Sequence, residues 1–225
     1  MIRAVIFDFD GTVADTLPAL TEGINRTMEH FSLPLHTVAE VRTYINHGAR
    51  ELCRAALPAA MQRDEEFLDR VLAVYNEKYG EVYHHTTAPY EGVAELIATL
   101  HRDYRIGVLS NKQDAYVKLL CAQVLPAGSV DAAQGDIAGH PTKPDPFLSR
   151  RIAASLGVSP EECVLVGDSD VDFATAKNAG MHHIGVTWGF RTKEQLRAAG
   201  VERFADTPRE VGELLRSLAT ESQRP

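Results

Sequence analysis

The sequence is short of cysteine and of positive charge. Its three cysteines, Cys53, Cys121 and Cys163, are far apart and lack the spacing of a metal site or redox pair, which predicts that they are reduced and structural. Lys and Arg number 23 against 31 Asp and Glu, so the net charge is -8. Because the phosphate backbone attracts basic surfaces, this balance argues against a nucleic-acid partner, and any phosphate site must be locally cationic.

Long apolar segments are also missing. No run approaches the roughly 18 apolar residues that a membrane-spanning helix needs, and the apolar run before Asp8 is too short for a signal peptide. With 44% hydrophobic and 24% charged residues over 225 positions, the composition is that of a globular protein with room for one or two domains. We therefore expect a cytoplasmic protein without a membrane partner.

The most informative stretch runs from Arg3 to Thr16 and reads RAVIFDFDGTVADT. Its four apolar residues, two of them β-branched and one aromatic, predict a buried central strand, which Gly11 then stops. Side chains alternate along a strand, so Asp8 and Asp10 should point the same way if extended geometry persists past the strand. Two carboxylates in one small space repel each other and favour a bound cation or a shared proton. This pattern indicates an active site.

Two other interpretations of this motif exist. A strand can simply end in a polar turn, and the motif alone does not decide against that. A calcium loop counted from Asp8 needs an oxygen ligand at its fifth position and Glu at its twelfth, and Thr12 and Ala19 occupy these positions. The preceding residues also resemble a strand rather than a helix, so we set calcium aside.

The segment after Asp15 changes to helical spacing, with apolar residues recurring from Leu17 to Phe31. Further helices are expected over residues 37–45, 48–57 and 64–83. No strand-like run interrupts them. We therefore assign residues 16–83 to an inserted helical-bundle cap, separate from a core of residues 1–15 and 84–225.

From residue 84 onward, strand-like and helix-like segments alternate. Strands are expected over residues 105–110, 129–134, 163–167 and 183–187. Helices are expected over residues 93–100, 112–124, 146–156 and 173–179. Such alternation predicts an α/β fold, a doubly wound parallel sheet with a Rossmann-like core, in which ligands bind beyond the carboxyl ends of the strands. The last residues, ESQRP, are expected to form a frayed tail.

Polar groups follow two of these predicted strands. Ser110 and Asn111 come after IGVL and offer a hydroxyl, an amide and the first turn of a helix to a phosphoryl oxygen, although the pair also resembles an ordinary helix cap. Lys143 lies between prolines in PTKPDP, where a helix cannot continue. It would supply the cation that carboxylates and phosphate need, unless it is a solvated loop lysine.

An acid-rich turn, GDSDVD, follows the strand at 163–167. Asp168 and Asp172 lie four residues apart, so both can face one point at the start of the next helix, whereas Asp170 is expected to face solvent. Since the carboxyl ends of the strands meet at one edge of the sheet, these groups should converge on Asp8. An oxygen-only set of ligands favours Mg2+ over zinc.

Taken together, DFDGT, SN, KPDP and GDSDVDFATAKNAG occur in the order and approximate spacing of the four haloacid dehalogenase motifs, and the chain resembles that superfamily over most of its length. The resemblance implies a magnesium-dependent phosphatase that works through an aspartyl-phosphate intermediate. It implies these roles: nucleophile, Asp8; general acid and base, Asp10; substrate binding, Thr12, Ser110, Asn111 and Lys143; metal binding, Asp8, Asp10, Asp168 and Asp172.

The inserted helices resemble the small cap of the phosphoglycolate phosphatase and β-phosphoglucomutase branch, which would close over the site and read the leaving group. The segments YINHGARELCRAAL, PYEGV and GVTWGF resemble phosphoglycolate phosphatases, although Asn46 stands where a small residue is expected. The implied partner is a small phosphorylated metabolite, 2-phosphoglycolate. Arg50 would pair with its carboxylate, unless it is a surface arginine. We expect a monomer or a homodimer.

Other functions share many of these features. An inorganic pyrophosphatase of the same superfamily would have every motif, and a β-phosphoglucomutase would differ mainly in its cap. A phospho-acceptor signalling receiver also places acids, a hydroxyl and a lysine at strand ends, but receivers are shorter and have no helical insertion after the first strand. An inactive interaction protein would have lost some of these residues, and all of them are present.

Overall fold

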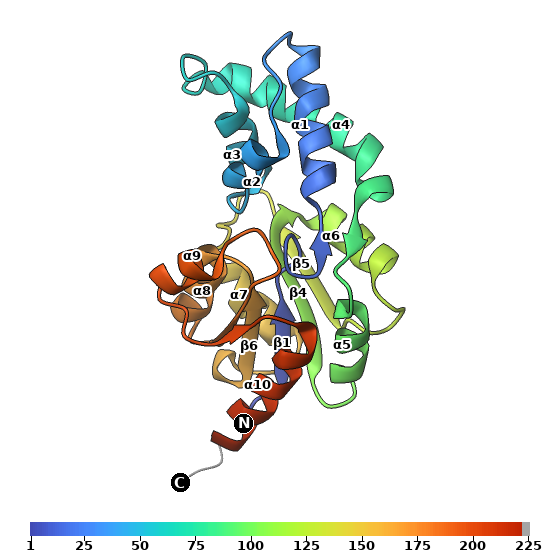
Figure 1. Ribbon diagram of the computed structural model, residues 1–225, viewed down its shortest axis with the longest axis vertical. Helices are drawn as coiled ribbons and strands as arrows, with labels where there is room; N and C mark the ends of the chain where they lie inside the picture. Colours follow the sequence, from blue (N-terminus) through green and yellow to red (C-terminus); the bar gives the residue numbers. More distant parts are fainter. Residues whose placement is uncertain (222–225) are drawn as a thin grey trace. The chain divides into compact units, whose positions relative to one another are not determined.

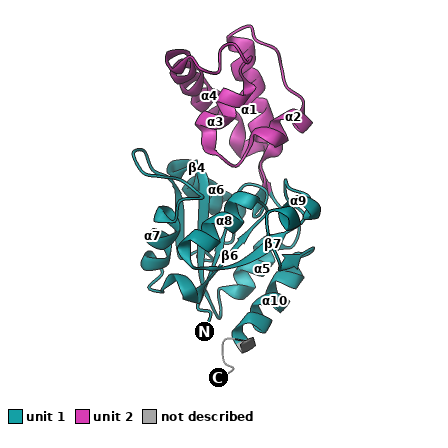
Figure 2. Cartoon of the chain, turned by 90° about the vertical axis from the view of Figure 1, so that its left-hand side faces the viewer, with its two compact units in different colours: residues 1–14, 89–225 teal, residues 15–88 magenta. Residues whose placement is uncertain are grey.

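The computed structural model describes residues 1–221 and divides into two compact units (Figure 2). Residues 1–14 and the chain from Pro89 onward form the first unit, and residues 15–88 form the second. The expected frayed tail, apart from Glu221 at the end of the last helix, lies outside the described residues. The roles of core and cap stay predictions for these units.

The first unit is built on a parallel sheet (Figure 1). Within the described residues this sheet has six strands in the order β5-β4-β1-β6-β7-β8. The strands are β1 (Ala4–Phe7), β4 (Arg105–Gln113), β5 (Ala132–Asp136), β6 (Cys163–Gly167), β7 (His182–Val186) and β8 (Phe204–Ala205). Neighbours pair in parallel throughout. From β1 the chain winds to β4 and β5 on one side, then returns past β1 to β6, β7 and β8, so the predicted doubly wound sheet is confirmed.

Helices of the first unit cover this sheet. They are α5 (Val93–Leu100), α6 (Asp114–Val124), α7 (Phe147–Ser155), α8 (Asp170–Ala179), α9 (Lys193–Ala198) and α10 (Pro208–Glu221), with a short 3-10 turn at Pro160–Glu162. On one face of the sheet, Ile6 and Leu165 belong to a buried cluster with Leu148 of α7. Val5 and Phe7 point to the opposite face and are also buried. Both faces of β1 are therefore covered, which explains why its residues are apolar throughout.

One element boundary near the site differs from the expected one. β4 continues to Gln113, so the helix expected from Lys112 begins only at Asp114, and Ser110–Asn111 lie in a strand rather than in a first helical turn. The cause is a tertiary contact, because the carboxylate of Asp114 accepts a hydrogen bond from the backbone N–H of Gly135 in β5 at 2.9 Å. This bond keeps the chain beside β5 beyond the point where the local sequence favours a helix.

Other boundaries shift by smaller amounts. α8 begins at Asp170, before the expected start at residue 173, because Ser169 caps it with a hydroxyl that accepts from the N–H of Asp172. The strand expected at 129–134 is found at Ala132–Asp136. α9, β8 and α10 form where no element was predicted.

The second unit is helical. It contains α1 (Leu17–His30), α2 (Val38–Tyr44), α3 (Gly48–Ala56) and α4 (Glu65–Thr86), close to the expected ranges. α1 packs along α4, where Gly23 allows the rings of Tyr75 and Tyr79 to approach its backbone. β2 (Ala14–Asp15) and β3 (Ala88–Pro89) pair where the chain passes between the units. Within residues 1–221, no helix is both long and apolar enough to cross a bilayer.

Candidate active site

Asp8 directly follows β1, the strand that lies between β4 and β6. Its N–H donates to the carbonyl of Val166 at 2.8 Å, and its side chain is buried. The chain then turns, because the N–H groups of Val13 and Ala14 both donate to the carbonyl of Phe9, at 3.0 and 3.1 Å. A tight turn therefore follows Asp8, and Asp10 lies within it.

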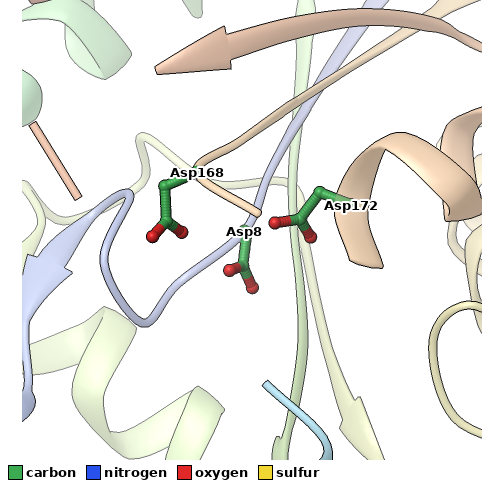
Figure 3. A group of neighbouring side chains, drawn as sticks. All are labelled: Asp8, Asp168 and Asp172. Atoms are coloured by element: carbon green, nitrogen blue, oxygen red, sulfur yellow. The ribbon is translucent and has the colours of Figure 1, made fainter. Parts of the chain in front are cut away.

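Three carboxylates meet beside the carboxyl ends of β1 and β6 (Figure 3). Asp8, Asp168 and Asp172 each offer one oxygen, and these oxygens lie within 4.8 Å of one another. All three residues are buried. Asp168 lies in the loop after β6 and Asp172 in the first turn of α8, so the structure brings together the two acids that the sequence spaces four apart.

The carboxylate of Asp168 is held on both sides. Its Oδ1 accepts the hydroxyl of Thr12 at 3.1 Å, and its Oδ2 accepts the N–H of Phe190 at 2.6 Å. Two glycines make room for it: Gly11 has φ +87° and a Cβ there would lie 2.5 Å from Asp168 Oδ2, while a Cβ on Gly189 would overlap Asp168 as well. Thr12 therefore orients Asp168, and its expected contact with the substrate stays a prediction. The sequence analysis did not predict the contact of Phe190 with Asp168, although it noted that the segment GVTWGF, which ends at Phe190, resembles phosphoglycolate phosphatases.

Lys143 supplies the positive charge of this group. Its Nζ donates to Asp8 Oδ1 at 2.7 Å, to Asp172 Oδ1 at 2.6 Å and to the carbonyl of Leu109 at 3.3 Å. Asn111 fixes the lysine backbone from both sides, because its amide donates to the Lys143 carbonyl at 2.9 Å and its oxygen accepts the Lys143 N–H at 2.8 Å. Asn111, expected to bind substrate, thus positions Lys143.

A second group of contacts surrounds Asp10. Its Oδ2 accepts the hydroxyl of Ser110 at 3.1 Å, and its Oδ1 lies 2.9 Å from the Nζ of Lys112. The side chains of Asp10 and Lys112 are 13% and 7% exposed. Lys112 was missed by the sequence analysis. Its place directly after Ser110–Asn111 at a strand end was the available signal, but the helix expected there placed it in a different element.

Burial controls the charge states in the cluster. Burial and the carboxylate of Asp172 raise the pKa of Asp8 well above its usual range, and the same two causes raise the pKa of Asp168 to about 7. Burial also opposes the charge of Lys143, but the carboxylates of Asp172 and Asp8 outweigh it and raise the pKa of this ammonium. Three carboxylates that share one ammonium favour an additional cation.

The donors suit a hard divalent cation. Asp8, Asp168 and Asp172 present carboxylate oxygens, and within residues 1–221 no His or Cys belongs to their group. Buried oxygen donors of this kind fit Mg2+ better than zinc. Asp10, expected as a further metal ligand, is not part of this group; its carboxylate contacts Ser110 and Lys112, and its role as a metal ligand stays a prediction.

Two predicted positions lie away from the carboxylate cluster. Asp170 is exposed, as its position in the acid-rich turn suggested. Arg50 is in α3 of the second unit, where its guanidinium donates to Asp69 at 2.5 Å and to Glu65 at 2.7 Å. Its expected pairing with a substrate carboxylate stays a prediction.

Comparison with known proteins identifies the family. The family model for haloacid dehalogenase-like hydrolases matches residues 5–186. A phosphoglycolate phosphatase of Rhodospirillum rubrum is 31% identical over 222 residues, which cover 96% of this chain and 91% of the relative. Two solved structures are also similar. One, from Lactobacillus delbrueckii subsp. bulgaricus with a provisional phosphoglycolate phosphatase designation, has a TM-score of 0.87 at 30% identity and covers 94% of this chain and 97% of its own.

The second structure is CbbY from Rhodobacter sphaeroides in complex with phosphate, with a TM-score of 0.78 at 27% identity and coverage of 94% and 97% of the two chains. The matched family model spans Asp8 and Asp168, which directly follow β1 and β6, and Lys143 in the loop between β5 and α7. The expected resemblance is confirmed, and the chain is an enzyme that belongs to the haloacid dehalogenase-like hydrolases.

Proposed function

We propose that this enzyme is a magnesium-dependent phosphatase that hydrolyses 2-phosphoglycolate through an aspartyl-phosphate on Asp8. The observation that carries the proposal is the buried group of Asp8, Asp168 and Asp172, with Lys143 Nζ at 2.7 Å from Asp8 and 2.6 Å from Asp172. This group combines a nucleophile, oxygen ligands and a fixed cation in one place. The names of the similar proteins support phosphoglycolate as the substrate.

In the first step, a carboxylate oxygen of Asp8 bonds to phosphorus while the bond from phosphorus to the ester oxygen breaks. Burial and Asp172 raise the pKa of Asp8, so the adjacent Lys143 ammonium is needed to favour the ionised nucleophile. A magnesium ion bound by the carboxylates would add to this effect and draw charge from the phosphoryl oxygens. The departing oxygen takes a proton from Asp10.

In the second step, water attacks phosphorus and gives its proton to Asp10. The bond between phosphorus and the Asp8 oxygen breaks, which releases phosphate and restores both carboxyl groups to their starting forms. The Ser110 hydroxyl, 3.1 Å from Asp10 Oδ2, holds the acid and base in one place for both steps. We assign the second unit, residues 15–88, the role of the cap that reads the leaving group.

The test is a screen of phosphorylated metabolites, pyrophosphate and β-glucose 1-phosphate with magnesium. We expect hydrolysis of 2-phosphoglycolate, activity near background for Asp8→Asn, and near-normal activity for Asp170→Asn, a matched control whose exposed carboxylate lies outside the cluster. Chelation should abolish activity and magnesium should restore it.

Two results would contradict the proposal: near-normal turnover by Asp8→Asn, or full activity after exhaustive chelation. A preference for pyrophosphate, or isomerisation of β-glucose 1-phosphate, would reassign the substrate and leave the role of Asp8 intact. Radiolabelled phosphate trapped on the wild-type protein, and absent from Asp8→Asn, would identify the intermediate directly.

A further inference from the structure

Lys112 is a second lysine of the first unit whose side chain is mostly covered, and the chemistry proposed above gives it no role. Its Nζ lies 2.9 Å from Asp10 Oδ1, and its side chain is 7% exposed. The other oxygen of Asp10 accepts the Ser110 hydroxyl, and the same hydroxyl oxygen accepts the Lys112 backbone N–H at 3.2 Å. The end of β4 therefore places the Lys112 ammonium beside Asp10, the proposed proton donor to the ester oxygen.

Lys143 and Lys112 contact different carboxylates of the proposed mechanism. Lys143 donates to Asp8, Asp172 and the carbonyl of Leu109, which matches the three N–H donors of an ammonium. Its positive charge therefore stabilises the ionised form of Asp8, the proposed nucleophile. Lys112 instead contacts Asp10, whose proton goes to the ester oxygen in the proposed mechanism. When the ester oxygen of a substrate lies beside Asp10, an ammonium hydrogen-bonded to Asp10 also lies close to that oxygen. It is then near the substituent on the carbon that bears the ester oxygen.

We propose that Lys112 is a specificity residue that pairs with a carboxylate carried one carbon away from the ester oxygen. The favoured substrates are then α-carboxylated phosphomonoesters, of which 2-phosphoglycolate is the smallest, rather than neutral alkyl phosphates. This inference rests on the proposed function and narrows its substrate class. A substrate carboxylate would form a charge-assisted hydrogen bond with this ammonium in addition to its contact with Asp10, whereas an alkyl group would form none.

The test compares 2-phosphoglycolate with ethyl phosphate, which has the same carbon skeleton without the carboxylate. The variants are Lys112→Met, Lys112→Arg and the control Lys118→Met, which removes an exposed lysine of α6 that pairs with Asp114. For Lys112→Met we expect kcat/KM for 2-phosphoglycolate to fall by about 10- to 100-fold, mainly through KM, from the loss of one charged hydrogen bond. Ethyl phosphate should change less than about threefold, because it makes no such bond.

Lys112→Arg keeps the charge and should retain part of the preference, and Lys118→Met should match the wild type. Equal losses for both substrates would overturn the inference and make Lys112 a residue that merely positions Asp10. Unchanged kinetics would overturn it as well. Circular dichroism checks the fold, and Lys112→Gln serves in place of the Met variant if that one does not fold.

A different result would show that the proposed phosphatase function itself is wrong. In that case the wild type would hydrolyse neither compound, nor p-nitrophenyl phosphate. Calorimetric titration with magnesium present then measures recognition without turnover, in Asp8→Asn and in Asp8→Asn combined with Lys112→Met. Tighter binding of 2-phosphoglycolate than of ethyl phosphate, lost in the double variant, would support the role of Lys112 independently. Equal binding of the two compounds by Asp8→Asn would overturn it.

Discussion

Lys143 and Lys78 each bridge two carboxylates, but in different surroundings. Lys143 Nζ lies 2.7 and 2.6 Å from Asp8 and Asp172, and 3% of its side chain is exposed. Lys78, in α4 of the second unit, lies 2.8 and 3.1 Å from two glutamates of its own helix, with 24% of its side chain exposed. The distances are similar, so the difference between the sites is access to water.

That difference determines what each bridge can do. At the surface, solvent and salt screen the charges, and such pairs contribute little. In the interior, removing one partner leaves charges that water cannot reach, and the remaining groups respond by changing their protonation. The same arrangement of a lysine between two carboxylates is thus a minor helix contact in one unit and the candidate site of chemistry in the other.

The largest expected effect comes from removing each bridge in turn. Lys143→Met should lower phosphatase activity by about a thousandfold or more, and the free energy of unfolding at pH 7.5 without magnesium by ~3 kcal/mol, because it leaves buried carboxylates unpaired. Lys78→Met should leave activity unchanged. Urea unfolding and steady-state kinetics on both variants make the comparison, and equal behaviour of the two would show that burial is not the cause.

The pH dependence of Lys143→Met tests the same cause. Burial raises the pKa of Asp168 to about 7, above the value of about 4 in an unfolded chain. A carboxyl with a raised folded pKa binds its proton more tightly in the folded state, so its contribution is most favourable below about pH 4 and is lost as pH rises through about 7. The Lys143 ammonium lowers this pKa, so Lys143→Met should raise it further, and the stability lost in the variant should be partly regained at pH 5, where Asp168 is protonated with or without the lysine. A deficit that is constant between pH 5 and 7.5 would contradict this explanation.

The contrast also explains which parts of the site could be predicted from the sequence. Asp8 and Asp168 each follow a strongly apolar strand, β1 and β6, and parallel strands end at one edge of a sheet. Lys143 lies between prolines outside any helix. Local pattern together with one topological rule was sufficient to bring these residues together, and the family match agrees with that topology.

Contacts between distant segments explain what was missed. β4 runs on to Gln113 because Asp114 is tied to β5, and nothing in the local sequence announces that bond. The extension places Lys112 beside Asp10, which the sequence analysis had assigned to the metal. The missed position of Lys112 is thus a case in which a hydrogen bond between distant residues overrides a local preference.

His183 extends the comparison to a buried group with no bridge. Within residues 1–221, neither ring nitrogen has a hydrogen-bond partner, and the ring packs edge-on against Phe173 with centroids 5.5 Å apart. Burial lowers the pKa of His183 to about 4. The Lys143 ammonium also lowers this pKa, whereas the Asp172 carboxylate raises it. The unfolded chain, with a pKa of about 6.5, therefore binds the proton first, so stability is full above that pH and declines as pH falls toward 4.

A further prediction follows from this titration of His183. His183→Leu should remove up to ~1.4 kcal/mol of destabilisation per pH unit between about pH 6.5 and 4, and at pH 8 it should be no less stable than the wild type because it breaks no hydrogen bond. Urea unfolding across this range measures the difference, and His140→Leu, which removes an exposed histidine, is the control. Parallel curves for wild type and His183→Leu would show that His183 does not titrate as its burial implies.

Substitution of Arg50 has the smallest expected effect. It tests whether exposed ion pairs contribute as little as the comparison with the buried pairs implies. Both ends of its guanidinium are engaged within the second unit, by Asp69 at 2.5 Å and Glu65 at 2.7 Å, and its side chain is 38% exposed. Both cations already contact carboxylates, but the Lys112 side chain is only 7% exposed, whereas exposed pairs such as those of Arg50 are screened by salt. We therefore expect Lys112, rather than Arg50, to dominate the recognition of a substrate carboxylate.

Arg50→Gln should leave KM for 2-phosphoglycolate within about twofold of the wild type, with a small loss of thermal stability that fades as salt is raised, since the change removes screened surface pairs. Asp69→Asn is the matched variant, because it releases one end of the guanidinium without removing the cation. If Arg50 instead reads the substrate, Arg50→Gln will raise KM for 2-phosphoglycolate at least tenfold while ethyl phosphate is unaffected, and Asp69→Asn will lower it by freeing the charge. That pair of results would assign recognition of the substrate carboxylate to Arg50 rather than to Lys112. It would also mean that the exposed ion pairs of Arg50 serve to position its guanidinium for binding and contribute little to stability.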